Sequence, residues 1–319
     1  MTPPDLTIRS VSRAEDFAVA PGDDPDYVGT VAAIWEDGEG RPEWTFVAAL
    51  DGIPVARVGY VVTDTVTDPA WLASLPPKEL GLFGPAAWGE DPVATLEATI
   101  RRTIAVTGGD LTLELTANPE RHPDVEMRRQ LAGRLGLDLF QEKEGVLWVD
   151  HGSPITVPDR LAFRTIAEIG AERYGEVMAR PGSGTLDRND AWYYARVRAP
   201  DWAAQMLEFC DEGDEGTWLI GEIDGDPVGY VAVSPFHDEG TATIVHIGVV
   251  PEHRGHGYID DLLAAGTEVA REAGFNRILS DVDVLNAPML AAMERAGHLA
   301  SATTWHVWAY RGMPSSEPA

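Results

Sequence analysis

The segment best suited to bind a ligand is a glycine-containing loop at residues 249–259, Val-Val-Pro-Glu-His-Arg-Gly-His-Gly-Tyr-Ile. An apolar stretch precedes it and a helical pattern follows, so the unpaired N–H groups of a helix start lie beside the loop. Gly255 and Gly257 let the backbone approach a ligand closely, and Arg254 adds a fixed positive charge. The loop therefore predicts an anion site, most naturally for a diphosphate. It is neither a Walker A loop nor a complete dinucleotide-binding fingerprint.

The sequence around the loop indicates the elements that position it. Apolar residues recur at helical spacing over 257–273, and Gly274 ends that pattern. The other expected elements are strands at 161–166, 241–250, 277–284 and 299–310, helices at 167–180, 198–210 and 286–296, and a hairpin at 217–235. Their order predicts a mixed α/β domain with a mostly antiparallel sheet.

A similar order of elements occurs earlier in the chain. Residues 45–62 and 217–235 each contain two apolar strands joined by Asp-Gly-X-Pro-Val, and Asp-Gly between such strands is a strong hairpin signal. Residues 127–149 and 289–310 each contain an amphipathic helix ended by glycine and a strand that carries Trp. We therefore predict a tandem duplication. The alternative is that common α/β motifs recur without a shared origin.

The duplication predicts an α/β (α+β) protein of two domains, residues 1–152 and 159–312, joined by a stretch with Gly and Pro. The elements expected in the first domain are strands at 5–10, 79–84, 111–116 and 138–149, a hairpin at 45–62, and helices at 92–106 and 124–135. Each domain is expected to have a mixed, mostly antiparallel sheet flanked by helices.

The loop, with the segment that begins at Asn286, resembles the GNAT acetyltransferase family. In that family the pattern Arg/Gln-X-X-Gly-X-Gly/Ala binds the pyrophosphate of acetyl-CoA. Arg254 and Gly257 match the pattern, whereas Ile259 stands where Gly or Ala is usual. Asn286 matches an Asn that begins the next helix and contacts the coenzyme arm. The residues that the resemblance implies for coenzyme binding are Val249, Val250, Arg254, Gly255, His256, Gly257, Tyr258, Ile259 and Asn286.

The resemblance covers about residues 160–310 and implies two tandem GNAT-like domains of actinobacterial type, the first a degenerate copy that lacks the loop. It also implies direct acyl transfer, in which an amine attacks the thioester of acetyl-CoA. The strand before the loop is expected to splay, so that the N–H of Val249, with Val250 next to it, polarises the thioester carbonyl.

Two positions depart from the family pattern. Met293 stands where many members have a Tyr that acts as an acid, and Thr243 stands where many have a Glu. The titratable group nearest on that strand is His246, and histidine titrates near neutral pH, so His246 is the candidate base. Tyr258 is a candidate acid. The alternatives are a hydrogen-bonded strand histidine and a tyrosine used for packing.

Residues 189–202 lie where GNAT folds often line the acceptor site. Trp192 and Tyr193 are candidates for an aromatic wall around an amine, with Asp190 or Asp201 supplying negative charge. The alternative is ordinary packing of an amphipathic helix. Cys210, the only cysteine, is expected to be a small buried residue and not a nucleophile.

Composition excludes several classes of function. The chain has 319 residues with 24 Lys and Arg against 52 Asp and Glu, a net charge of −28. Such a chain lacks the basic surface of a nucleic-acid binder and is repelled by anionic lipid. The charge favours solubility first and a cationic acceptor second. One cysteine permits neither an intrachain disulfide nor a Cys-based zinc site, and we expect no metal. The absence of a signal sequence or membrane-spanning stretch leads us to expect a cytoplasmic protein.

The sequence thus predicts an acetyl-CoA-dependent N-acetyltransferase that acts on a small, cationic amine. A non-catalytic acyl-CoA-binding or sensor protein is the main alternative, because of Met293 and Thr243. A structural or partner-binding protein without coenzyme is a third hypothesis, because of Ile259 and the absence of the loop from the first domain. The oligomeric state stays open between a monomer and a homodimer.

Overall fold

The computed structural model describes residues 5–19, 27–62, 80, 86–104, 111–117, 125–195, 197–208, 216–236, 239–300 and 306–312. The chain divides into two compact units. Unit 1 contains Met1–Phe140 and Trp308–Ala319, and unit 2 contains Gln141–Val307. These units group the chain differently from the predicted domains 1–152 and 159–312, which stay a prediction about the duplication.

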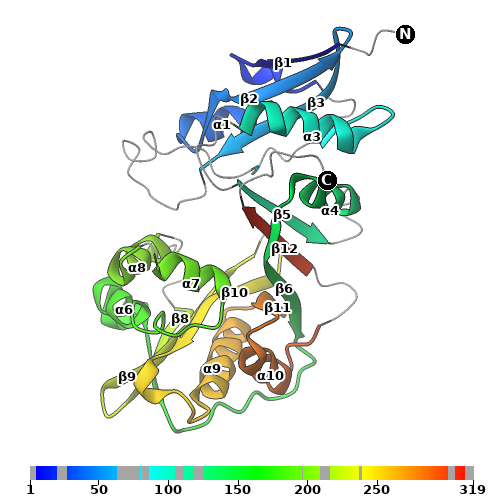
Figure 1. The fold of residues 1–319 in the computed structure, drawn as a ribbon. Coiled ribbons are helices and arrows are strands. Elements are labelled where there is room, and N and C mark those ends of the chain that lie inside the picture. Colours follow the sequence, from blue (N-terminus) through cyan, green and yellow to red (C-terminus); the bar gives the residue numbers. More distant parts are fainter. Residues whose placement is uncertain are drawn as a thin grey trace. The chain divides into compact units, whose positions relative to one another are not determined.

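Unit 1 contains an antiparallel sheet in the order β1-β2-β3-β4, formed by β1 (Leu6–Ser10), β2 (Gly40–Leu50), β3 (Ile53–Val61) and β4 (Ala86–Ala87). Its other elements are a 3-10 turn at Ala14–Asp16, helices α1 (Tyr27–Glu36), α3 (Pro92–Thr103) and α4 (Val125–Leu135), and the neighbouring strands β5 (Leu111–Ala117) and β12 (His306–Gly312, within the unit from Trp308). Figure 1 shows α3 lying along this sheet.

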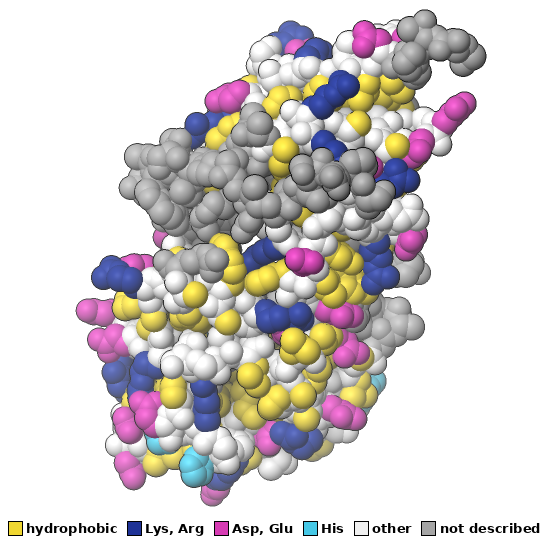
Figure 2. Space-filling model, viewed as in Figure 1, with side chains coloured by type: hydrophobic (Ala, Val, Ile, Leu, Met, Phe, Trp, Pro, Cys, Tyr) yellow, Lys and Arg dark blue, Asp and Glu magenta, His cyan; other side chains and the backbone are white. Residues whose placement is uncertain are grey.

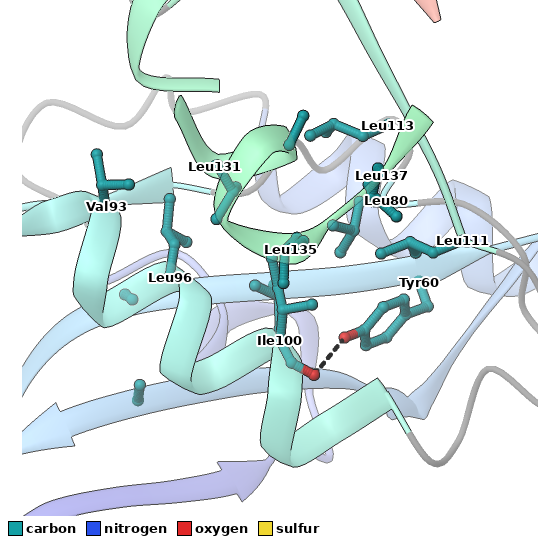
Figure 3. Close-up of a cluster of buried hydrophobic side chains, with 14 of the residues drawn as sticks. Tyr60, Leu80, Val93, Leu96, Ile100, Leu111, Leu113, Leu131, Leu135 and Leu137 are labelled. Atoms are coloured by element: carbon teal, nitrogen blue, oxygen red, sulfur yellow. Dashed lines mark hydrogen bonds between the residues drawn. The ribbon is translucent and has the colours of Figure 1, made fainter. Parts of the chain in front are cut away.

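The core of unit 1 follows from the spacing of apolar residues on α3. Val93, Leu96 and Ile100 lie on one face of the helix and pack with Leu131 and Leu135 of α4 (Figure 3). The helix begins at the Asp91 cap, whose carboxylate accepts the Ala94 N–H at 3.0 Å, with proline in the first turn. Unit 1 therefore buries its own hydrophobic core.

Unit 2 contains six neighbouring strands in the order β6-β11-β10-β9-β8-β7. They are β6 (Asp138–Val149, within the unit from Gln141), β11 (Arg277–Asp283), β10 (Thr241–Val249), β9 (Asp226–Pro235), β8 (Trp218–Ile223) and β7 (Ala162–Thr165). The β10–β11 pair is parallel and the other described pairs are antiparallel. The helices are α5 (Ile166–Ile169), α6 (Ala171–Met178), α7 (Arg188–Tyr194), α8 (Ala199–Leu207), α9 (Tyr258–Glu272) and α10 (Ala287–Arg295). This confirms the predicted mixed, mostly antiparallel sheet flanked by helices.

The central strand β9 is buried on both faces. Tyr230 and Ala232 belong to the cluster that includes α6 and α8, whereas Val231 and Val233 belong to the cluster with α9 and α10. Figure 1 shows these two helix groups on opposite sides of the strands. Side chains alternate between faces along a strand, so helices on both sides require the nearly continuous apolar run of β9.

The two hairpin turns have nearly the same backbone geometry. Asp51 has a φ of 51° and Asp224 a φ of 53°, and they are the two non-glycine residues of the described chain with positive φ. The glycines that follow them, Gly52 and Gly225, have φ values of 83° and 84°. Two positive φ values in succession are the geometry of a type I′ hairpin turn. The matching turns support the tandem repeat.

Several local features differ from the sequence prediction. The helix predicted at 167–180 is divided into α5 and α6 at Gly170, whose φ is 83°. The strand predicted at 299–310 is described as β12 from His306, with Leu299 forming one bridge to Leu147. Helix α1 is not among the predicted elements, and α7 corresponds to the amphipathic helix given only as the alternative for residues 189–202. Cys210, Trp305 and most of the strand predicted at 79–84 lie outside the described residues.

The charged side chains are dispersed on the face drawn in Figure 2, where Asp and Glu lie among Lys and Arg without gathering in one patch. None of the described helices is long and apolar enough to cross a membrane.

His298 makes the stability of unit 2 sensitive to acid. Its side chain is 1% exposed, Nε2 lies 3.2 Å from the Thr267 hydroxyl, and Nδ1 has no partner among the described residues. Burial lowers the pKa of His298 from 6.5 to about 4. The pKa of His298 is lower in the folded state than in the unfolded state. The contribution of the neutral imidazole to the free energy of unfolding is therefore complete above pH 6.5 and is lost as the pH falls towards 4.

The free energy of unfolding of the wild type should fall as the pH is lowered from 6.5 to 4. We predict that this fall is smaller by up to about 3 kcal/mol in His298→Gln, which has no imidazole to protonate. Urea titrations across this range measure the difference from the wild type. His151→Gln, at an exposed position, is the control. Parallel pH curves for wild type and His298→Gln would contradict the prediction.

Candidate active site

A β-bulge in β10 turns His246 towards the face that carries α7 and α8. The pairing of β10 with β9 shifts between Ile244 and His246. Ile244 belongs to the core under α9 and α10, whereas both Val245 and His246 lie on the other face, near Trp202. A bulge places two successive side chains on one face, so it gives His246 an orientation that regular alternation would deny.

His246 lies in a chain of hydrogen bonds with Tyr230 and Asp190. Its Nδ1 is 2.6 Å from the Tyr230 hydroxyl and its Nε2 is 3.0 Å from Asp190 Oδ2. Burial raises the pKa of Tyr230 well above its ordinary value, so Tyr230 keeps its proton. An ionised carboxylate only accepts hydrogen bonds, so Nε2 carries the proton shared with Asp190 and Nδ1 accepts from Tyr230. The ring therefore has a defined tautomer.

The position of Asp190 depends on the buried carboxylate of Asp283 at the end of β11. Arg188 pairs with Asp283 through two bonds of 2.8 and 2.9 Å, and the Arg188 backbone N–H donates to it at 3.0 Å. Gln141 on β6 donates to both Asp283 and Asp187 at 3.1 Å. These contacts fix the first turn of α7, and Asp190 lies in that turn.

The pKa values of the Asp283 and Asp187 carboxyl groups move in opposite directions. Burial alone would raise the pKa of Asp283, but the bonds from the Arg188 side chain, backbone N–H groups and Gln141 hold it below its usual value. Burial, followed by the charge of Asp190, raises the pKa of Asp187. Asp187 caps α7 by accepting the N–H of Asp190 at 3.0 Å. Asp283 is thus the anion that neutralises Arg188, while Asp187 serves mainly as a cap.

Asp190 is the carboxylate at this site with an oxygen available to a ligand. Its side chain is 19% exposed, and Oδ1 makes no hydrogen bond to a described residue. The other sequence candidate, Asp201, forms an ion pair with Arg198 at 2.6 Å on the exposed side of α8. Of the two carboxylates, Asp190 is the one that the structure brings to His246.

Aromatic side chains surround the Asp190–His246 pair. Trp202 contacts the His246 ring edge to face at 5.0 Å, and Tyr194 packs on Trp202 at 4.9 Å. Trp192 and Tyr193 lie in a T-shaped contact at 5.1 Å on α7. Tyr193 also packs against the core of this face, as the alternative expected. Trp192 is half-buried outside the described core clusters.

The strand β10 separates from β11 as the sequence analysis expected. The two strands are paired at two described positions, Thr241 with Arg277 and Ala242 with Ile278. Further along β10, the Val250 N–H donates to Val228 of β9 at 2.9 Å. Hydrogen-bonded and non-bonded pairs alternate in an antiparallel ladder, so the Val249 N–H points away from β9. Val249 is therefore the available donor, and the N–H of Val250 is committed to the sheet.

The loop after β10 presents a series of backbone donors. Gly255 and Gly257 have φ values of 82° and 75°, which favour glycine. Among the described residues, the N–H groups of residues 255–259 have no hydrogen-bond acceptor. They lie at the start of the 15-residue helix α9, where the macrodipole favours an anion. Ile259 contributes a backbone N–H like the other residues, so its departure from the family pattern removes no donor.

The guanidinium of Arg254 does not lie free beside these donors. It donates to the carbonyls of Ser183 at 2.6 Å, Val249 at 3.2 Å, and Pro181. A Cβ on Gly182 would overlap the Tyr194 ring, so this loop also packs on α7. Arg254 thus ties the end of β10 to the segment that leads into α7, a role that the motif did not indicate.

The remaining predicted residues occupy distinct positions. Tyr258 is the first residue of α9, with its ring next to His256 and His253 at centroid distances of 5.8 and 6.1 Å. Asn286 caps α10 by accepting the Met289 N–H at 3.3 Å, which agrees with its expected place at a helix start. Met293 is 2% exposed in the core. Among the described residues, no group of three or more His, Cys, Asp or Glu side chains is arranged to hold a metal.

Comparisons with known proteins agree with this geometry. Residues 186–298 match the model of the acetyltransferase (GNAT) family. The chain is 34% identical over 87 residues to streptothricin acetyltransferase of Streptomyces lavendulae, which covers 27% of this chain and 46%, about half, of that protein. It is 26% identical over 272 residues to mycothiol acetyltransferase of Clavibacter sepedonicus, which covers 66% of this chain and 84% of that protein.

Two solved structures share the fold across nearly the whole chain. A tandem GNAT protein from the clavulanic acid biosynthesis pathway has a TM-score of 0.56 at 15% identity, covering 98% of this chain and 100% of that one. A GCN5-related N-acetyltransferase from Sphaerobacter thermophilus has a TM-score of 0.53 at 17% identity, covering 98% of each chain. These likenesses support the predicted tandem arrangement of the fold.

We predict that Arg254→Ala speeds amide exchange at Thr185 by about tenfold or more, because the segment at 181–184 loses several hydrogen bonds. The Thr185 N–H donates to Gly182 within that segment at 3.3 Å. Hydrogen exchange followed by NMR measures the effect. Arg180→Ala, which removes only the exposed ion pair with Glu252, is the matched control. Unchanged exchange at Thr185 would show that Arg254 does not hold this segment.

Proposed function

Residues 186–298 form a GNAT acetyltransferase domain, and from this premise we propose that the protein transfers an acetyl group from acetyl-CoA to the amine of a small, cationic acceptor. The observation that carries the proposal is the arrangement along one strand. β10 carries His246, paired with Asp190, and ends at Val249 immediately before the N–H donors of residues 255–259. The Asp190–His246 pair and a site for an anion therefore lie at the same strand and its loop.

The described residues fit acetyl-CoA as the donor. The N–H groups of residues 255–259 and the start of α9 suit its diphosphate, since they are unpaired donors at the positive end of a helix dipole. Asn286 at the start of α10 is proposed to contact the coenzyme arm. Acetyl-CoA would supply the acetyl group as a thioester, and the Val249 N–H is proposed to polarise its carbonyl.

Asp190 and His246 are proposed to prepare the amine for attack. A protonated amine binds to Asp190 Oδ1, where the carboxylate attracts its charge and Trp192 stands on the same helix. The amine must lose a proton to become a nucleophile, and Asp190 Oδ1 receives it, because His246 Nε2 already carries a proton and Nδ1 accepts from Tyr230. Tyr230 and Asp190 hold the imidazole on both sides, so the ring needs no reorientation.

The next role to assign is that of the acid that protonates the departing thiolate. The buried Met293 carries no proton to donate, and Tyr258 stays the proposed acid. A thiol of ordinary pKa near 8.5 also leaves readily as an anion, so this step needs only modest assistance at neutral pH. The buried Met293 is the observation that favours the second candidate function, a protein that binds acyl-CoA without turnover.

We predict that the protein releases CoA from acetyl-CoA in the presence of at least one amine in a broad panel, followed with a thiol reagent. Asp190→Asn and His246→Gln should each lower kcat/KM about 100-fold, the usual scale of general-base catalysis. Asp201→Asn is the matched control, because Asp201 pairs with Arg198 at the surface, and it should retain near wild-type activity.

CoA release no faster than the blank across the whole panel would contradict the transferase proposal. Calorimetry then separates the alternatives: saturable acetyl-CoA binding without turnover supports the acyl-CoA-binding protein, and no binding excludes both. Equal losses in Asp190→Asn and Asp201→Asn would contradict the assignment of Asp190.

A further inference from the structure

The side chain of Arg160 contacts backbone carbonyl groups of the loop at residues 249–259, where the coenzyme is proposed to bind. In the segment between β6 and β7, its Nη1 donates to the His256 carbonyl at 3.1 Å and its Nη2 to the Gly257 carbonyl at 3.2 Å. Nη2 also pairs with Asp261 at 2.6 Å, and the guanidinium carbon lies 5.2 Å from the centroid of the Tyr258 ring. The Arg160 side chain thus contacts both the backbone carbonyls of the loop and the first turn of α9.

The geometry of the peptide group gives these contacts a consequence for anion binding. The described peptide bonds are trans, so each C=O points opposite to the N–H of the next residue. When Arg160 fixes the carbonyls of His256 and Gly257, it also fixes the N–H groups of Gly257 and Tyr258 on the opposite side. Both N–H groups belong to the unpaired series at the start of α9.

Arg160 is itself held by Asp261. The Asp261 side chain is 1% exposed, whereas that of Arg160 is 46% exposed. The Oδ2 atom of Asp261 has no hydrogen-bond partner among the described residues, so Arg160 supplies the cation that compensates this buried carboxylate. The ion pair holds the Arg160 guanidinium at the loop, because Asp261 lies in the first turn of α9, the helix that follows the loop.

Arg254, the arginine within the motif, does not perform this task. Its side-chain N–H groups donate to carbonyls of the segment at 181–184 and to the carbonyl of Val249. Arg160 is the cation that contacts the two loop carbonyls, although it lies 96 residues before His256. A cation on the carbonyl side also polarises the peptide groups, which strengthens their N–H donors towards an anion.

We propose that Arg160 is a positioning residue for the coenzyme diphosphate: it fixes the peptide groups at residues 256–258 so that the N–H groups of Gly257 and Tyr258 face the phosphates. This rests on the proposed function, in that the loop is the acetyl-CoA site. It assigns the preorganisation of that site to a residue outside the glycine motif, in the segment of unit 2 between β6 and β7.

The test compares two acetyl donors in wild type and Arg160→Ala. Acetyl-CoA contains the diphosphate, and S-acetylpantetheine contains the same thioester arm without it. The KM for acetyl-CoA should rise about tenfold or more, because charge-assisted bonds to two N–H groups lose their preorganisation. The kcat, and kcat/KM for S-acetylpantetheine, should stay within about twofold, because the proposed role concerns only phosphate binding. An equal loss with both donors would overturn the proposal.

Three further variants separate positioning from charge and stability. Arg295→Ala removes the ion pair with Asp260 (2.7 Å) in the same turn of α9 without touching the loop carbonyls, and it should leave both donors unaffected. Arg160→Lys keeps the charge but not the forked donor pair, so it should restore only part of the affinity. If Arg160 serves only to neutralise Asp261, Arg160→Ala combined with Asp261→Asn restores the wild-type KM, which would overturn the proposal.

Calorimetric titration with CoA measures the loss of coenzyme affinity in Arg160→Ala directly, without turnover. Binding that weakens about tenfold in Arg160→Ala and not in Arg295→Ala supports the role of Arg160 even if no amine is acetylated, in which case only the transfer reaction fails. Wild-type protein that binds no CoA would overturn both the proposed function and the role of Arg160.

Discussion

The buried carboxylate of Asp283 is the interaction on which the geometry of the site depends. It receives hydrogen bonds from the side chain and backbone of Arg188 and from Gln141. These residues come from β11, α7 and β6, so one anion joins elements that are more than 90 residues apart in the chain. Removing one partner of such a buried pair costs about 3–5 kcal/mol. The first turn of α7, with Asp190, is therefore held in place strongly enough to meet His246.

The second constraint is the irregular path of β10. The bulge after Ile244 turns His246 towards α7 and α8, and the separation from β11 leaves the Val249 N–H outside the ladder. The same strand then ends in the loop whose N–H groups start α9. The proton transfer, carbonyl polarisation and diphosphate binding that we propose thus depend on three successive departures from regular strand structure. A regular β10 would keep its N–H groups in the sheet and leave His246 without its contacts.

Much of this arrangement could be predicted from local sequence. The strand, glycine loop and helix at 241–273 follow from apolar periodicity and from glycine, and the Asp-Gly turns predicted both hairpins. The bulge could not be predicted, because helices cover both faces of this sheet, so the sequence of β10 does not indicate which face Val245 and His246 take. The orientations of Arg160 and Arg254 depend largely on contacts with residues 70 to 101 positions away in the chain. The motif identified Arg254 but not the direction of its guanidinium, and no local signal marked Arg160.

The most direct test of the account is the tautomer of His246, because the claim is that Asp190, held through Asp283, accepts the Nε2–H of the ring with Oδ2 and the proton of the amine with Oδ1. NMR of protein labelled with ¹⁵N-histidine reports which ring nitrogen carries the proton. The account predicts a neutral ring protonated at Nε2 in the wild type, and loss of this defined state in Asp190→Asn. A wild-type ring protonated only at Nδ1 would contradict it, since Asp190 would then have to donate the shared proton and could not accept one from the amine.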